Sequence, residues 1–351
     1  MRLFTSALCS VVAIGLISGC AGNMSPSSSA LPGAGQQFRT GFTPVNVMGV
    51  PTRAEQVLHS ILQPDVMRNA SSGLYVSEFD ASDVYGYPAA NKGNKGPTCM
   101  VPNVSYVNGI GVDGAGNLMA PDGGASYLLL YKGPGMCGKS FGEIADTYGQ
   151  PSDAASTNAA TGKIALANIF DTGKTPGSLS ICTNKGGCTT NLTNSKIYEA
   201  GGVAMSTKGD CWLSASGVES GGTSPSLMYF KGCAGKGAAA TGFKNTGYGN
   251  LDIDSKGNIV STDSVAETIY VYSGCATACK VVSGPFKMHG QSFFGKLNST
   301  STAYAMADIA NGAVDVYTYS PTKIKYSYSF TKGLAASLVP IGTAYNPRSK
   351  E

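Results

Sequence analysis

Apolar and polar residues alternate along most of the chain in short runs, which is the pattern of half-buried β-strands. One longer phrase recurs. Residues 110–122 and 251–263 each read as an apolar run, a turn containing Gly-Asn, and a second apolar run that ends in Asp. A weaker copy covers residues 203–213, with Gly209 and Asp210 at the turn. Because glycine supplies the positive φ of a tight hairpin, each copy predicts two antiparallel strands.

The predicted hairpins recur at a nearly constant interval. Six second strands begin at residues 74, 117, 163, 210, 258 and 303, so the steps between them are 43, 46, 47, 48 and 45 residues. Third strands follow at 84–87, 128–131, 179–182, 227–230, 269–272 and 316–319. Fourth strands are predicted at 141–147, 279–283 and 323–330. Tyr87, Tyr131, Tyr272 and Tyr319 end four of the third strands, and this repetition indicates packing rather than a ligand surface.

Four short strands in each repeat of about 45 residues are typical of a β-propeller blade. We therefore predict an all-β fold, a six-bladed β-propeller of four-stranded antiparallel blades, over residues 64–351. Residues 338–346 read as a first strand without a successor. We expect them to complete the blade that begins near Leu74, since this removes the open edge of the array. Residues 64–70 are a competing candidate for that place, and both remain open.

Residues 112–122 and the copy that ends at Asp263 resemble NHL repeats and the related gluconolactonase-like propellers, whose blades carry a similar strand, Gly-Asn turn and strand ending in Asp. The likeness covers about 280 residues as a repeat and is sharp in two or three blades. It implies architecture more than activity. In the gluconolactonase-like propellers, acidic and amide oxygens hold a divalent ion in a funnel at the central channel, where the ion activates water or polarises a carbonyl.

Composition supports a compact β-rich protein. Of 351 residues, 42% are hydrophobic and only 13% are charged, with a net charge of +4. This balance provides no field for binding a polyanion, so nucleic acid is not an expected partner. The 47 Gly, 18 Tyr and 12 Phe argue against both long helices and disorder.

Residues 1–19 have the parts of a secretory signal: Arg2, a short apolar run and small residues before a cleavage point. The run is too short for a stable membrane span. Residues 17–20, Ile-Ser-Gly-Cys, resemble the lipobox of bacterial lipoproteins, which implies cleavage before Cys20 and lipidation of Cys20. We therefore expect an extracytoplasmic lipoprotein of the bacterial cell envelope, anchored to the membrane through lipid on Cys20. The alternative is an ordinary signal peptide with a chance cysteine.

Two segments lie between the predicted anchor and the propeller. Residues 20–51 are predicted to be a lipid-anchored flexible linker, because the stretch after Cys20 is rich in Gly, Ser, Ala and Pro. Thr52 and Glu55 form a capping box that predicts a short helix over 52–63. The apolar residues of this helix share one face, which indicates packing against the propeller rather than recognition of a partner helix.

Eight of the ten cysteines remain after Cys9 in the signal and Cys20 at the anchor are set aside. An even number in an exported chain predicts disulfides. The predicted strands place Cys211 near Cys233 in one blade and put Cys182 with Cys188, and Cys275 with Cys279, at turns between third and fourth strands. Cys99 and Cys137 remain and would link adjacent blades. The alternative is a metal site with loosely zinc-like spacing, although no Cys-x-x-Cys occurs and the chain has only two histidines.

Polar residues recur where first strands begin and second strands end, and in propellers these loops meet on one face around the channel. The candidate ligand-binding residues of such a funnel are Asn108, Asp122, Asn168, Glu199, Asn250, Asp263, His289 and Asp308. Glu199, Asn250 and Asp263 are of the types that would hold a divalent cation such as calcium, although no cofactor is firmly implied. The alternative is that these side chains cap their own turns, and that His289 is packed or bonded to solvent.

No nucleophile elbow, phosphate loop or zinc-binding helix occurs in the sequence, so no catalytic residue is assigned. Three functions remain open. The first is a binding scaffold for a protein, glycan or small molecule. The second is a metal-dependent lactonase-like hydrolase or lyase that uses the funnel. The third is a structural protein of the envelope.

Overall fold

The computed structural model describes residues 73–79, 81–88, 92, 95–133, 135–171, 176–216, 225–247, 249–334 and 339–348. The predicted signal peptide, the linker and the helix over 52–63 lie outside the described residues. The competing closing strand at 64–70 also lies outside them.

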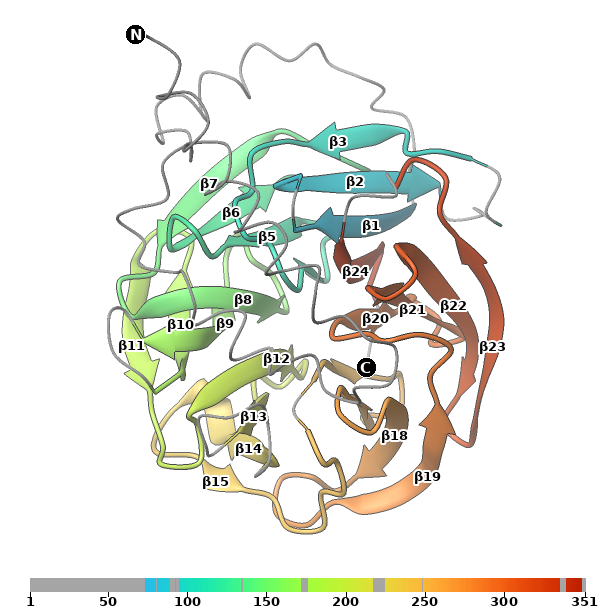
Figure 1. Cartoon of the computed structure of the whole chain (residues 1–351). Coiled ribbons are helices and arrows are strands. Elements are labelled where there is room, and N and C mark those ends of the chain that lie inside the picture. The colour runs from blue at the N-terminus through green and yellow to red at the C-terminus, as the bar shows by residue number, and fades with distance from the viewer. Residues whose placement is uncertain are drawn as a thin grey trace, which may run out of the picture.

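Six four-stranded antiparallel sheets surround a central axis, and their colours run once around the ring in Figure 1. This confirms the predicted six-bladed propeller. In blades 1 to 3 the strands, from the axis outward, are β24 (Pro340–Asn346), β1 (Gly73–Glu78), β2 (Asp83–Pro88) and β3 (Cys99–Val101); β4 (Gly111–Val112), β5 (Leu118–Asp122), β6 (Tyr127–Tyr131) and β7 (Ser140–Ala145); and β8 (Gly149–Ser156), β9 (Lys163–Asp171), β10 (Ser178–Thr183) and β11 (Gly187–Leu192).

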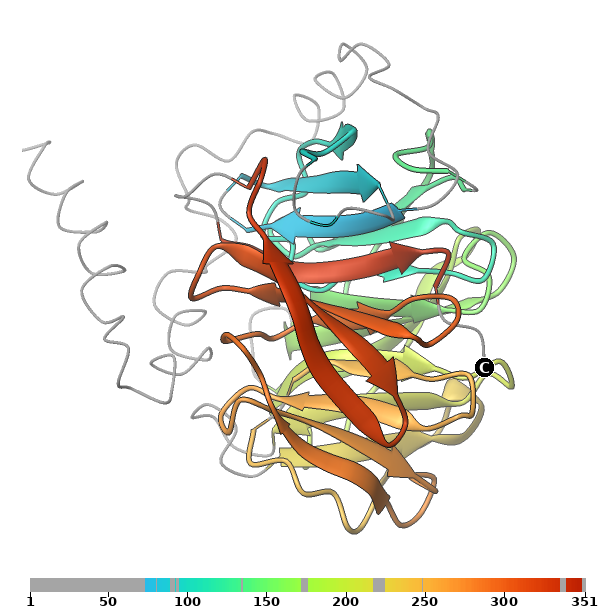
Figure 2. The ribbon, with the colours of Figure 1, turned by 90° about the vertical axis from the view of Figure 1, so that its right-hand side faces the viewer.

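Blades 4 to 6 repeat the same order. Their strands are β12 (Glu199–Met205), β13 (Cys211–Ser216), β14 (Pro225–Phe230) and β15 (Ala238–Ala239); β16 (Leu251–Ile253), β17 (Ile259–Asp263), β18 (Thr268–Ser273) and β19 (Lys280–Lys287); and β20 (Gly295–Leu297), β21 (Ala303–Asp308), β22 (Ala313–Ser320) and β23 (Lys323–Phe330). Figure 2 turns blades 5 and 6 toward the viewer, with the long outer strand β23 in front.

The ring closes between the two ends of the described chain. Strand β24 pairs antiparallel with β1, and Thr343 lies opposite Val76. The C-terminal strand therefore supplies the innermost strand of blade 1, as the run at 338–346 predicts. This pairing covers the inner edge of β1, which would otherwise present unpaired backbone groups.

The repeated hairpin has a side-chain network in addition to its glycine. Asp113 Oδ1 accepts hydrogen bonds from the N–H groups of Ala115 and Asn117, each at 2.9 Å, and Asp113 Oδ2 accepts from Asn117 Nδ2 at 2.7 Å. Asp254 binds the corresponding groups of its own hairpin. Gly116 has a φ of 85°, which explains why glycine precedes the asparagine. The phrase thus specifies a closed turn through the local bonding of Asp.

Apolar side chains fill the space between neighbouring blades. One cluster joins Tyr304 and Tyr317 of blade 6 to Val260 and Val271 of blade 5, and the other blade pairs have comparable clusters. The recurring tyrosines belong to this packing: Tyr87, Tyr272 and Tyr319 are buried and Tyr131 is partly buried. Each blade therefore depends on its neighbours for burial of its faces.

The eight cysteines of the propeller form four disulfides in the predicted pairs, Cys99–Cys137, Cys182–Cys188, Cys211–Cys233 and Cys275–Cys279. Three lie within a blade, and Cys99–Cys137 joins blade 1 to the loop between β6 and β7. Within the described ranges, no helix has the length and apolar character needed to cross a membrane.

Candidate functional site

All eight candidate funnel residues lie on one face of the ring, where the innermost strands begin and the second strands end. We call this the funnel face. Seven of the eight are buried, and the most exposed of these seven is Asn108, at 4%. The exception is His289, whose side chain is 45% exposed. The structure therefore places these residues on the same face, but most of their side chains point into the protein.

Asp263 shows how such a residue is used. Its Oδ1 accepts from the N–H groups of Gly247, Val265 and Ala266 at 3.0, 3.0 and 2.9 Å. Its Oδ2 accepts from both the N–H and the hydroxyl of Thr246. The carboxylate thus organises the loop before β16 and the turn after β17. This is the arrangement expected of a turn cap, and it occupies the oxygens that a metal ion would need.

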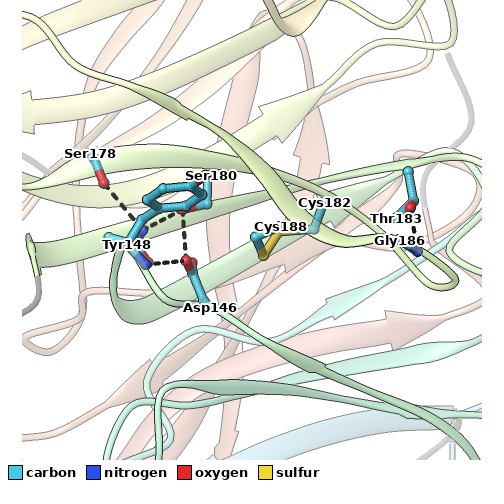
Figure 3. The surroundings of a disulfide bond; sticks show 9 residues. Asp146, Tyr148, Ser178, Ser180, Cys182, Thr183, Gly186 and Cys188 are labelled. Atoms are coloured by element: carbon cyan, nitrogen blue, oxygen red, sulfur yellow. Dashed lines mark hydrogen bonds between the residues drawn. A yellow bond between two sulfur atoms is a disulfide. The ribbon is translucent and has the colours of Figure 1, made fainter.

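Asp122 and Asn168 also bond within their own surroundings. Asp122 Oδ1 accepts from the N–H of Ala125 at 2.9 Å. Asn168 Nδ2 donates to the hydroxyls of Ser178 at 3.2 Å and Ser180 at 2.7 Å. Ser180 in turn donates to Asp146 at 3.0 Å, as Figure 3 shows. These contacts join strands β9 and β10 of blade 3 to the loop after β7.

Asp146 also lies within 4.8 Å of both sulfurs of Cys182 and Cys188, which would be a metal-ligating set if the cysteines were thiolates. In Figure 3 the two sulfurs are bonded to each other. A disulfide sulfur has no thiolate charge to offer a metal. The predicted disulfide and the alternative metal site compete for the same atoms, and the structure has the disulfide.

Asn250 connects blades 5 and 6. Its side-chain amide donates to the carbonyl oxygen of Gly295 and, at 3.1 Å, to the hydroxyl of Tyr304. Its backbone N–H donates to Thr262 Oγ1 at 2.8 Å. Asn108 holds the chain before β4, because its carbonyl oxygen accepts from Ser77 Oγ at 2.5 Å. Glu199 is buried at the first position of β12.

The central channel contains a narrow cavity of about 30 Å³. All six innermost strands contribute to its wall, and none of the eight funnel candidates does. Val112, Met205 and Ile253, which end their strands, line it, so the cavity extends toward the face opposite the funnel face.

A buried ion pair crosses the channel. Lys296 Nζ donates to Asp153 Oδ2 at 3.0 Å and to the carbonyl oxygen of Leu251 at 2.9 Å. The same Asp153 oxygen accepts from the N–H of Val203 at 2.9 Å. Burial raises the pKa of Asp153, while the Lys296 ammonium and the Val203 N–H act in the opposite direction. The pair connects blades 3, 4, 5 and 6 near the axis through charge-assisted hydrogen bonds.

Asp252 extends this polar centre. Its Oδ2 accepts from the N–H of Leu297 at 2.7 Å, and its Oδ1 accepts from the N–H of Ile253 at 2.9 Å. Burial raises the pKa of Asp252, and the positive charges of Lys296 and Arg348 oppose that change. Arg348 lies just beyond β24 and lines the cavity with Asp252.

Two of the funnel candidates, His289 and Asp308, lie close together, and Asp315 joins them. His289 Nδ1 lies 3.4 Å from Asp315 Oδ1, and the ligand atoms of His289, Asp308 and Asp315 all lie within 4.8 Å of one another. Burial raises the pKa of Asp308; Asn311 opposes the change by hydrogen bonding, and the negative charge of Asp315 adds to it. This group, which we call the His-Asp-Asp cluster, lies between blades 5 and 6 on the funnel face.

Sequence reasoning did not single out Asp153, Asp252, Lys296 or Asp315. The available signal was weak: each is a charged residue inside a short run that otherwise reads as a buried strand. Charged residues in such places are rarely buried unless they are paired. The pattern therefore marks them as unusual but does not name their partners, which lie in other blades.

No protein-family model matches the sequence, and no curated protein matches it. Solved structures do match the fold. A chain from the structure of a nidogen/laminin complex has a TM-score of 0.55 and 12% identity, and the match covers 78% of this chain and 98% of the other. A Bacteroides caccae protein of unknown function has a TM-score of 0.53 and 11% identity, with 78% and 99% covered.

A Xanthomonas campestris protein described as a gluconolactonase has a TM-score of 0.48 and 12% identity, with 69% of this chain and 84% of the other covered. At such identities the matches with scores above 0.5 show the propeller fold alone. The score of the gluconolactonase supports no argument about activity.

Proposed function

We propose that this protein is an extracytoplasmic binding module, anchored to the membrane through lipid on Cys20, that captures a protein partner on the outer edge of blades 5 and 6. The observation that carries the proposal is the location of exposed apolar side chains. Four large hydrophobic residues of the described chain are exposed. Three of them, Val281, Val282 and Tyr326, lie on the outermost strands β19 and β23.

All the charged side chains of these two strands are positive. Lys280, Lys323 and Lys325 are exposed, and neither strand contains Asp or Glu. Lys287 is bonded to Glu267 at 2.6 Å and is therefore partly neutralised. Exposed apolar residues surrounded by charge of one sign are typical of a partner surface. The chemistry fits a protein segment with acidic and apolar side chains.

The backbone of the strands also suits such a partner. Both β19 and β23 are eight residues long and occupy the outer edge of their sheets. An outer strand presents N–H and C=O groups that an added extended segment can pair with. Lysines on an edge strand disfavour pairing with the edge strand of another molecule. Here they would also favour an acidic segment over a basic one.

The metal-dependent lactonase-like hydrolase or lyase has less support. Of the three residues expected to hold its divalent ion, Asp263 is occupied by turn contacts. Asn250 donates its side-chain NH2 group to blade 6, which leaves only its Oδ1 to bind an ion. None of the three lines the cavity of the central channel. These contacts give the predicted funnel less support as a metal-dependent hydrolytic site than the partner surface has as a binding site.

The proposed location rests on the sequence of residues 1–20 and on the four disulfides, which persist in oxidising compartments. Intact mass of the membrane-associated protein tests it. We expect loss of residues 1–19 and an added acyl mass on Cys20, and the Cys20→Ala variant should leave the membrane fraction. An unmodified Cys20 in the mature chain would contradict the anchor.

The partner surface is tested by site-specific photocrosslinking in intact cells. A photoreactive amino acid replaces Val282, and the matched control carries it at Lys256, an exposed turn residue of the same blade. We expect a discrete protein adduct from position 282 that is absent from position 256 and is reduced by Lys323→Glu together with Lys325→Glu. Equal adducts from both positions, or none from position 282, would rule out this surface.

A further inference from the structure

We propose that the His-Asp-Asp cluster, His289, Asp308 and Asp315, binds a divalent transition-metal ion such as Zn²⁺. The cluster lies between blades 5 and 6. His289 belongs to the loop between β19 and β20, Asp308 ends β21, and Asp315 lies within β22. The site includes His289 and Asp308 of the predicted funnel but lies away from the cavity of the central channel. It borders the partner surface proposed above through Tyr326, which stacks on His289.

The spacing of the ligand atoms suits a metal ion. Zn²⁺ lies about 2.0–2.2 Å from imidazole nitrogen and carboxylate oxygen, so two ligands of a tetrahedral ion are about 3.4 Å apart. His289 Nδ1 and Asp315 Oδ1 are 3.4 Å apart. All three ligand atoms fall within 4.8 Å of one another, so binding of the ion would draw the Asp308 carboxylate closer to the other two ligands.

The charge of the cluster also calls for a cation. Asp308 and Asp315 are each 1% exposed, and neither has a lysine or arginine partner among the described residues. Their hydrogen bonds come from neutral groups. The backbone N–H and side-chain amide of Asn311 donate to the two oxygens of Asp308, at 3.2 and 2.7 Å, and the hydroxyls of Ser329 and Tyr317 donate to Asp315. Two neighbouring buried carboxylates are costly unless positive charge compensates them. A divalent ion balances both charges, whereas His289 alone balances at most one.

The surroundings hold the three side chains in place. The imidazole of His289 stacks on the ring of Tyr326, with centroids 4.0 Å apart and planes 12° apart. The backbone N–H of His289 donates to the hydroxyl of Tyr317 at 2.8 Å. At Gly290 a Cβ atom would lie 2.0–2.2 Å from the Asp308 carboxylate, so glycine leaves the space that this carboxylate occupies.

Access to the site comes through His289, which is the exposed member of the cluster. Three protein ligands leave a fourth tetrahedral position for water or for a group from another molecule. One imidazole with two carboxylates suits Zn²⁺ better than a cluster of oxygen ligands alone would.

The test uses the full chain without a polyhistidine tag, stripped with EDTA and then titrated with Zn²⁺ by calorimetry. We expect one ion per chain and a rise in the unfolding temperature. His289→Ala should weaken Zn²⁺ binding by at least about 100-fold. Loss of a residue that only hydrogen-bonds to a metal ligand already lowers affinity by up to about 100-fold, and loss of the ligand itself should cost no less. The matched controls His59→Ala, which removes the other histidine, and Glu267→Gln, which removes a nearby carboxylate, should bind as the unaltered chain does.

Substitution of Co²⁺ gives a second measurement. Its visible absorption reports nitrogen and oxygen ligands, and Asp315→Asn should change that spectrum while the circular dichroism of the fold is retained. Binding well below one ion per chain, or equal affinity in His289→Ala, would overturn the proposal. The proposal would also be overturned if Asp308→Asn raised the unfolding temperature above that of the unaltered chain by the same amount with and without EDTA. In that case the two carboxylates of the unaltered chain would share a proton and would not bind a metal.

Discussion

The tyrosines that end the third strands occupy equivalent places in their blades but differ in what their hydroxyls do. Tyr319 donates to Asp254 Oδ2 at 2.9 Å, which ties blade 6 to the hairpin of blade 5. Tyr272 donates to Asn245 Oδ1 at 2.8 Å. The hydroxyl of Tyr87 is buried and has no hydrogen-bond partner within the described part of the chain. Burial raises the pKa of all three hydroxyls, so each is neutral at physiological pH and acts as a donor where a partner exists.

Tyr319→Phe should therefore lower the free energy of unfolding by about 2 kcal/mol, because it removes a hydrogen bond to a buried carboxylate. The matched change Tyr87→Phe should alter it by less than about 0.5 kcal/mol, since a buried hydroxyl without a partner contributes no such bond. Urea unfolding at pH 7 measures both values. Equal losses in the two variants would show that ring packing, rather than the hydroxyl, determines the effect.

At the scale of elements, hairpins and disulfides act over short stretches of chain. The Asp-x-x-Gly-Asn phrase closes the turn between first and second strands in blades 2 and 5. Blade 4 has a related turn, in which Ser206 Oγ accepts from the N–H of Asp210 at 3.1 Å. The disulfides differ mainly in the length of chain they enclose: Cys99–Cys137 spans 38 residues, and Cys275–Cys279 spans 4.

Removing these two disulfides should have unequal effects. Chain entropy predicts a loss of about 4 kcal/mol for serine in place of Cys99 and Cys137, and about 2 kcal/mol for serine in place of Cys275 and Cys279. Denaturant unfolding of the two double variants measures the difference. If the short loop proved the more costly, native-state packing around Cys275 and Cys279 would be the dominant contribution instead of chain entropy.

At the scale of the whole molecule, stability depends on closing the ring. Strand β24 completes blade 1, and its Thr343 hydroxyl donates to the carbonyl oxygen of Ala305 in blade 6 at 2.7 Å. Every residue of β24 is buried. Without this strand, blade 1 would have three strands and an open inner edge, and the contact between the first and last blades would be lost.

A chain that ends at residue 338 should therefore lose more than about 5 kcal/mol, which is comparable to the whole stability of a typical domain. We expect a broad unfolding transition and self-association through the exposed edge of β1. Scanning calorimetry and light scattering measure these two effects. A peptide of residues 339–351, added in trans, should restore the cooperative transition, and a truncated chain that stayed monomeric and cooperative would contradict this role for β24.

Local patterns alone predicted the blade number, the hairpins and the cysteine pairs, because these depend on spacing within one repeat or between adjacent repeats. Alternation with a period of two marks a strand wherever it occurs, and a Gly-Asn turn specifies a hairpin without reference to the rest of the chain. The choice between residues 338–346 and residues 64–70 was different. Both could pair with β1 on pattern alone, and only the closed ring shows β24 in that place.

The candidate site was predictable in part. The repeat placed the eight polar residues on one face, but it could not show that seven of them point into the protein or that Asp263 is occupied by its own turns. Lys296 and Asp153, separated by 143 residues, meet only at the axis, and Asp315 joins His289 and Asp308 only when blade 6 packs on blade 5. Sequence spacing determines which strands form, whereas the partners of buried charges depend on which blades face each other, and that is decided when the ring closes.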